Sequence, residues 1–323
     1  MIASFIVAAL LAQTSPEAKP TVAVTPLVES LKKSITAEAI KADVTELSSD
    51  EMGGRFFRSP FAEKAAKWIT GKFEATGLTV VRQPIDTNAE SGPNLIAVLP
   101  APKEGASAGY ILVTAHYDHL RPKRSGDDKI HNGADDNASG IAGMLAVARA
   151  LDAAAKSGTP AKCAVVFVAF NGEEAGMLGS RAYVTAPSVP LNDVRAVFNM
   201  DMISRGKPRE IYIDGGPVGA SVIATLKKAN ESIGLSLRLD EHPDWLNRSD
   251  QGPFLAKQVP AVLFSVEDHE DYHRVSDEVS KIDASLAAEV AQLVALAVIE
   301  SSAESFTPRE VPTLAPAAAT AAP

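Results

Sequence analysis

Several short segments of this chain are apolar along nearly their whole length, rather than at every second residue. The clearest examples are NLIAVLP (94–100), GYILVTAHYD (109–118), CAVVFVAF (163–170) and AVLFSVED (261–268). A strand of this kind must be covered on both faces, which is typical of parallel strands that lie between two layers of helices. These segments therefore limit the fold to an α/β protein with a buried central sheet.

Helical patterns separate the apolar segments. Residues 59–78, 137–154, 217–234 and 283–301 carry apolar side chains at helical spacing, and further strands are predicted at 194–202 and 210–216. No linker long enough to divide the chain interrupts this alternation. We therefore predict one domain over residues 28–305, a three-layer αβα sandwich with a mixed, largely parallel central sheet.

The two ends of the chain differ from this domain in composition. The apolar run from Ile2 to Ala12 is too short to span a bilayer as a helix, and it resembles the apolar core of a secretory signal, although no Lys or Arg precedes it. Residues 1–20 are therefore predicted to be a signal peptide and leader, and the protein to be exported, either periplasmic or secreted. The Pro/Ala-rich residues 306–323 are predicted to be a disordered tail.

Charge and cysteine content exclude other classes of protein. A net charge of −9 argues against a general nucleic-acid binder, which needs a basic face. The single cysteine, Cys163, excludes a disulfide within the chain, and its place at the start of an apolar run predicts an inert core residue.

Groups that can bind metals follow the predicted strands. In an α/β sheet, functional residues gather at the carboxyl ends of the strands. Any one of these residues has a simpler explanation, such as a helix cap or a turn. Together, carboxylates and imidazoles without thiolates indicate a catalytic site for zinc or a similar divalent ion. The candidates are His116 and Asp118, Asp135 and Asp136, Glu173 and Glu174, Asp201, and finally His269, Tyr272 and His273.

The adjacent glutamates, Glu173 and Glu174, suggest how such a site would work. Two neighbouring carboxylates repel each other unless they are solvated or a cation lies nearby. The ligand-bearing positions suffice for two metals, which would polarise a water molecule and the substrate oxygen together. One glutamate would then bind a metal, while the other takes the proton of the water as a general base.

The motifs AHYDHL, NGADDNASG, FNGEEAGMLGS, NMDMISR, RSDQGPF and DYHRVSDE resemble, in this order, those of the di-zinc exopeptidases that include bacterial leucyl aminopeptidases. This is the twenty-eighth family of metallopeptidases, and the resemblance covers residues 35–303. It implies two Zn²⁺ ions and a peptide substrate, and one departure is Gln251, where the family often has His. The implied ligands are His116 and Asp201 for one zinc, Glu174 and His273 for the other, and Asp136 as the bridge.

Three residues have implied catalytic roles. Glu173 would be the general base, and Asp118 would hydrogen-bond His116 and fix its tautomer. Tyr272 would donate to the developing oxyanion, unless it is simply a packed aromatic residue. The resemblance assigns no ligand role to His119, His131, His242 or His269.

The reaction itself has alternatives. Aminopeptidase activity is favoured, but Arg205, Arg248 or Arg274 could instead bind a substrate carboxylate, as in a metallo-carboxypeptidase or dipeptidase. Glutaminyl cyclisation with one zinc is a further alternative. An inactive relative would be expected to lack ligands or the base, and here every expected position is filled.

Overall fold

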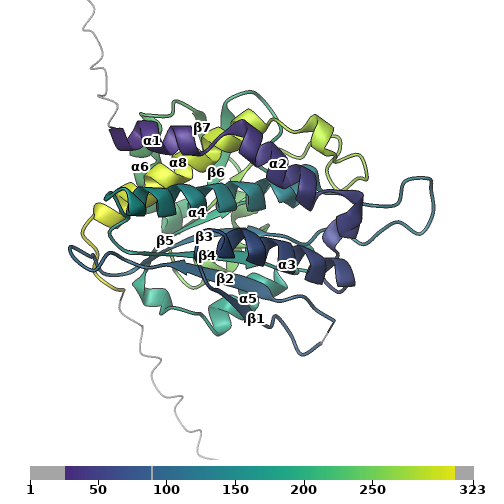
Figure 1. Cartoon of the computed structure of the whole chain (residues 1–323), viewed down its shortest axis with the longest axis horizontal. Coiled ribbons are helices and arrows are strands. Elements are labelled where there is room, and N and C mark those ends of the chain that lie inside the picture. Colours follow the sequence, from purple (N-terminus) through teal and green to yellow (C-terminus); the bar gives the residue numbers. More distant parts are fainter. Residues whose placement is uncertain (1–25, 89, 310–323) are drawn as a thin grey trace, which may run out of the picture.

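A computed structural model describes residues 26–88 and 90–309, which form a mixed eight-stranded sheet between helices (Figure 1). The strands run in the spatial order β1-β2-β4-β3-β5-β8-β6-β7. Their bounds are β1 Val80–Gln83, β2 Asn94–Leu99, β3 Tyr110–His116, β4 Ala164–Phe170, β5 Val194–Met200, β6 Glu210–Asp214, β7 Ser236–Leu239 and β8 Ala261–Ser265.

The four central strands, β4, β3, β5 and β8, are parallel to one another, with register pairs such as Val113 with Phe167 and Asn199 with Leu263. The pairs β1–β2, β2–β4 and β6–β8 are antiparallel, and β6–β7 is parallel. The predicted fold class is therefore confirmed. Because the central strands are parallel, their carboxyl ends meet at one edge of the sheet.

Helices cover both faces of the sheet, one face more thickly than the other (Figure 1). Alternate strand residues point to opposite layers: Val113 and Phe167 belong to the larger core, Leu112 and Val166 to the smaller one. The larger layer contains α1 Pro26–Ser34, α2 Ala37–Leu47, α3 Pro60–Glu74, α4 Gly140–Lys156, α6 Gly216–Asn230 and α8 Ala284–Ala303. The smaller layer contains α5 Leu178–Thr185 and α7 Gln251–Ala256.

Local sequence explains where the helices begin. The Ser59 side chain accepts a hydrogen bond from the backbone N–H of Ala62, and Pro60 occupies the first turn of α3, where its missing N–H costs nothing. Two stretches, Ala134–Lys156 and Ala284–Ala303, are long and apolar enough to cross a membrane, but 78% and 67% of their apolar windows are buried inside the protein. They form the core of the larger layer.

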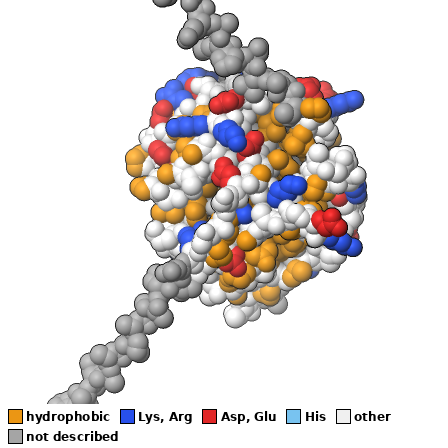
Figure 2. Space-filling model, turned by 90° about the vertical axis from the view of Figure 1, so that its left-hand side faces the viewer, with side chains coloured by type: hydrophobic (Ala, Val, Ile, Leu, Met, Phe, Trp, Pro, Cys, Tyr) orange, Lys and Arg blue, Asp and Glu red, His pale blue; other side chains and the backbone are white. Residues whose placement is uncertain are grey.

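The predicted leader, residues 1–20, and most of the predicted tail, residues 306–323, lie outside the described residues. Residues 306–309 pack against the domain, where the Arg195 guanidinium lies 4.7 Å from the centre of the Phe306 ring. Figure 2 shows the side of the molecule on which the first and last described residues, 26 and 309, lie. Basic and acidic side chains are interspersed there among apolar ones, rather than gathered into one basic patch.

Candidate metal centre

A first cluster of ligand atoms forms where β3 and β5 end. His116 is the last residue of β3, and its Nε2 atom lies 3.1 Å from Asp201 Oδ1, just after β5, and 3.5 Å from Asp136 Oδ1. His116 is 1% exposed. The strands thus bring together three of the predicted ligands, although they lie far apart in the sequence.

A second cluster shares Asp136 with the first. His273 Nε2 lies 3.3 Å from Asp136 Oδ2 and 3.2 Å from Glu174 Oε2. His119, to which the sequence assigned no ligand role, also lies here, with Nδ1 at 2.7 Å from Glu174 Oε1 and 3.6 Å from Asp136 Oδ2. The two carboxylate oxygens of Asp136 therefore face different clusters.

The donor atoms fit zinc in both chemistry and spacing. Zinc bonds of about 2.0–2.1 Å in a tetrahedral arrangement hold neighbouring ligand atoms about 3.3 Å apart. The contacts of His116 with Asp201 and Asp136, 3.1 and 3.5 Å, and those of His273, 3.2 and 3.3 Å, bracket this value. The donors are carboxylate oxygens and imidazole nitrogens, which suit zinc.

Without a metal ion, the carboxylates favour a proton on two of the imidazoles, those of His273 and His116. Burial alone would lower the pKa of His273, but hydrogen bonds to Asp136 and Glu174 outweigh it and raise this pKa to about 10. Burial likewise opposes the charge of His116, yet Asp201 raises the pKa of His116 well above its ordinary value. A divalent cation would replace these protons.

Two buried carboxylates, those of Asp277 and Asp135, hold the loop that carries Asp136. Asp277 accepts the backbone N–H of Asp135 at 3.1 Å and that of Asp136 at 3.0 Å. Asp135 accepts hydrogen bonds from Ser204 N and Oγ, both at 2.7 Å, and contacts His269 Nε2 at 3.2 Å. These bonds join the loop that carries Asp136 to those that follow β5 and β8.

Asp118 contacts both the residue that ends β3, His116, and the paired glutamates that follow β4. Its carboxylate accepts the backbone N–H groups of Glu173 at 3.1 Å and Glu174 at 3.3 Å. His116 Nδ1 lies 3.2 Å from the Asp118 backbone oxygen and 3.7 Å from its carboxylate. The hydrogen bond that can set the tautomer of His116 therefore goes to the backbone of Asp118, while the side chain holds the paired glutamates.

Arg55 is a fully buried cation that the sequence analysis missed. Its guanidinium donates to four backbone carbonyls: Tyr117 at 2.8 Å, Leu47 at 2.9 Å, Asn132 at 2.7 Å and Gly133 at 3.0 Å. Burial lowers its pKa to about 10. It therefore stays charged at neutral pH and joins the end of α2 to the loop after β3 and to the loop before Asp136.

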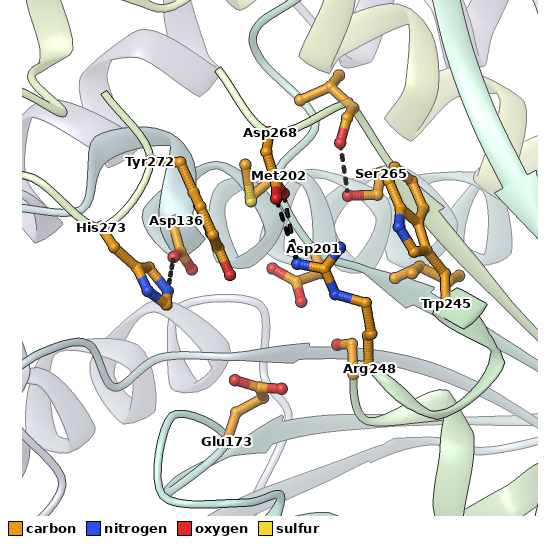
Figure 3. Close-up of a pocket in the computed structure, with 13 residues that line it drawn as sticks. Asp136, Glu173, Asp201, Met202, Trp245, Arg248, Ser265, Asp268, Tyr272 and His273 are labelled. Carbon is orange, nitrogen blue, oxygen red and sulfur yellow. Dashed lines mark hydrogen bonds and ion pairs between the residues drawn. The ribbon is translucent and has the colours of Figure 1, made fainter. Parts of the chain in front are cut away.

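A cavity opens beside the two clusters (Figure 3). Glu173 faces it, and Tyr272 reaches into it from a ring stacked 3.8 Å from that of His273. Burial, followed by the Asp136 charge, raises the pKa of Tyr272, which keeps its hydroxyl protonated. Other lining residues include Asp136, Asp201, Met202, Trp245, Arg248, Leu263, Ser265, Val266, Asp268 and His273.

The candidate carboxylate-binding arginines are placed differently. Arg205 is paired with Asp271 at 2.9 Å, and Arg274 is exposed and does not line the cavity. Arg248 does line it, only loosely paired with Asp268 at 3.4 Å. Gln251 is buried and donates to the Trp245 backbone oxygen at 2.7 Å.

The remaining histidines have structural contacts. The His131 Nδ1 atom lies 3.0 Å from the backbone oxygen of Arg121, and His242 stacks on Trp245 with ring centroids 3.8 Å apart. Cys163 is buried, as predicted.

The parallel strands thus gather carboxylates and imidazoles at their carboxyl ends, which is an arrangement that suits a divalent metal site. The sequence model of Peptidase family M28 matches residues 94–298, and the chain belongs to this family.

Two curated relatives illustrate the similarity. Leupeptin-inactivating enzyme 1 of Streptomyces exfoliatus is 27% identical over 83% of this chain and 56% of its own length. Aminopeptidase YwaD of Bacillus subtilis is 28% identical over 69% of this chain and 47% of its own. The chain thus spans about half the length of these relatives. The structure of BSAP, a zinc aminopeptidase from Bacillus subtilis, superposes with a TM-score of 0.70 at 19% identity, covering 82% of this chain and 95% of that one.

Proposed function

We propose that the protein is a zinc-dependent aminopeptidase, which hydrolyses the N-terminal peptide bond of a peptide. Two zinc ions would be held, one by His116 and Asp201, the other by Glu174 and His273, with Asp136 between them. The observation that supports this most directly is the orientation of Asp136, whose two oxygens face separate clusters at 3.5 Å and 3.3 Å from their imidazoles. The names of the relatives, an aminopeptidase and a zinc aminopeptidase, agree with this activity.

The bound zinc pair would supply Lewis acidity, which lowers the pKa of water and polarises the scissile carbonyl. Glu173 would take a proton from the attacking water and deliver it to the departing amine. Burial raises the pKa of Glu173 well above its ordinary value, and Asp201 and Glu174 add to the effect. A carboxylate of this kind holds a proton more readily than a solvated one, which suits a group that must accept and return it.

Two further residues would support the reaction. The Tyr272 hydroxyl would donate a hydrogen bond to the carbonyl oxygen as negative charge develops there. Asp118 would fix the backbone of Glu173 and Glu174 by accepting hydrogen bonds from their N–H groups, at 3.1 and 3.3 Å. The base and its neighbouring ligand would then keep a fixed separation.

The test compares Glu173→Gln with Glu174→Gln. Both variants replace one carboxylate with an amide at neighbouring positions, but only Glu174 belongs to the second cluster, where it contacts His273. Glu173→Gln should retain two zinc ions per chain, measured by mass spectrometry, and lose about 10²–10⁴-fold in kcat on free aminoacyl-p-nitroanilides. Glu174→Gln should lose zinc. Loss of zinc from Glu173→Gln would contradict the division of roles between the two glutamates.

Substrates of the same series with an acetylated amine distinguish aminopeptidase activity from the alternative reactions. An aminopeptidase requires the free amine, so wild-type protein should cleave only the unblocked series, lose activity with a chelator and regain it with zinc. Selective cleavage of dipeptides with a free carboxylate would instead favour Arg248 as a carboxylate ligand. Formation of pyroglutamate from N-terminal glutamine would favour cyclisation.

We also propose that the protein is exported, on the basis of the apolar run from Ile2 to Ala12. Expressed in a bacterial host, it should be found in the periplasm or the medium with a shortened N-terminus. Full-length protein that stays in the cytoplasm would contradict export.

A further inference from the structure

His119 belongs to the second cluster by position. It lies three residues after the end of β3, is 0% exposed, and directs Nδ1 toward Glu174 Oε1 at 2.7 Å and Asp136 Oδ2 at 3.6 Å. These are the two carboxylates that His273 contacts through their Oε2 and Oδ2 atoms at 3.2 and 3.3 Å. The ligand atoms of His119, Asp136 and Glu174 all lie within 4.8 Å of one another.

The ring of His119 is held in this position by the chain around it. A Cβ atom on Gly133, whose φ is +53°, would lie 2.6 Å from His119 Cδ2, so only glycine lets the loop before Asp136 pass this close. On the far side of the ring, Nε2 is buried and has no hydrogen-bond partner among the described residues. The polar contacts of the ring are therefore directed at the metal-binding carboxylates.

We propose that His119 is a fourth protein ligand of the second metal, through Nδ1, beside Asp136, Glu174 and His273. This rests on the proposed metal pair, but not on the reaction. Zinc sites with four protein ligands are closed, whereas catalytic sites keep one position open. The second metal would then have four protein ligands, and an open position for water or substrate would be left at the first, which His116 and Asp201 would hold.

A competing explanation is that His119 only donates a hydrogen bond to Glu174 and so positions it. The size of the effect separates the two explanations. Loss of an outer partner of a metal ligand typically lowers metal affinity 10–100-fold, while the ligand atoms around the metal stay the same. Loss of a ligand also changes the coordination number, which the absorption spectrum of bound Co²⁺ reports directly.

The experiment uses the full chain with His119→Asn, and with His131→Asn as the matched control. His131 is a neighbouring histidine, with its ring 6.2 Å from that of His119, and it makes its polar contact with a backbone oxygen instead of a carboxylate. Zinc affinity is measured by competition with a chromogenic chelator, and geometry by the visible spectrum of the Co²⁺-loaded protein. Circular dichroism checks that both variants are folded.

His119→Asn is expected to weaken one of the two zinc-binding steps by more than about a hundredfold, beyond the outer-partner range, and to change the Co²⁺ spectrum. His131→Asn should leave both unchanged. An unchanged Co²⁺ spectrum in His119→Asn, with or without a modest loss of affinity, would overturn the proposal and leave a positioning role. Wild-type protein that binds fewer than two ions would overturn the proposed metal pair itself, which is a distinguishable result.

Discussion

Asp250 is a buried carboxylate whose replacement by asparagine should stabilise the metal-free protein at neutral and higher pH. It occupies the N-cap position of α7 and is 0% exposed. Burial raises its pKa from 3.8 to about 7; His116 opposes this shift, while Asp118 and Asp201 add to it. The folded protein therefore resists the charge that this group carries freely in the unfolded chain.

The pKa difference gives the sign and size of the effect. Below about pH 4 the carboxyl is protonated in both states and costs nothing. Above the folded pKa it is charged in both, and the folded state is destabilised by about 4 kcal/mol, at about 1.36 kcal/mol per pKa unit. Burying an amide in its place costs about 1–3 kcal/mol. At pH 5 only about 1.6 kcal/mol of this destabilisation is present, because the unfolded carboxyl is ionised and the folded one is not. Asp250→Asn should therefore gain about 1–3 kcal/mol at pH 8 but change stability by only about −1 to +1 kcal/mol at pH 5.

Urea unfolding of chelator-treated protein at pH 5 and pH 8 measures this gain. The matched control is Asp244→Asn, a nearby exposed carboxylate, which should change the free energy of unfolding by less than about 0.5 kcal/mol at both pH values. A gain that is the same at pH 5 and pH 8, or no gain at pH 8, would refute the reasoning, because only a raised pKa makes the difference depend on pH.

Three further predictions concern His273, Asp118 and Cys163. Zinc must displace the proton of His273, whose pKa is raised to about 10. The zinc affinity of the second site should therefore rise about tenfold per pH unit from pH 6 to 9. A zinc affinity that does not change with pH in competition titrations would contradict this. Asp118→Asn should weaken zinc binding about 10–100-fold, since it removes an acceptor for the N–H groups of Glu173 and Glu174, and equal affinity would show that another group holds them. Burial raises the pKa of Cys163 to about 11, so a thiol reagent should label it only in concentrated urea, and rapid labelling of native protein would reveal local opening.

The central sheet could be predicted from the sequence because its strands are buried on both faces. Their uninterrupted apolar runs mark each strand, and the next polar residues lie at the edge where the parallel strands end. His116 and Asp201 lie together for this reason. The edge strands β1 and β7 were not predicted, since their residues are largely half-buried or exposed and carry little apolar signal.

The position of His119 could not be predicted in this way, because no strand periodicity extends three residues into a loop. Its direction depends on how the loop packs against Gly133, a contact between distant segments. Asp277 and Arg55 were missed for a related reason: they act on backbone atoms of other loops, and a sequence does not show which backbone groups will need a partner. The two glycines before Arg55 were the available signal of a tight turn there.

The hydrogen bonds of Asp277, Asp135 and Arg55 have a consequence for the life of the protein in a cell. They fasten the loops that carry the predicted ligands through protein atoms alone, so we expect these loops to keep their arrangement before zinc is bound. Molecules made during zinc shortage would then accumulate as a folded, idle reserve. Under the proposed function, the return of zinc would activate this reserve by binding alone, without new synthesis.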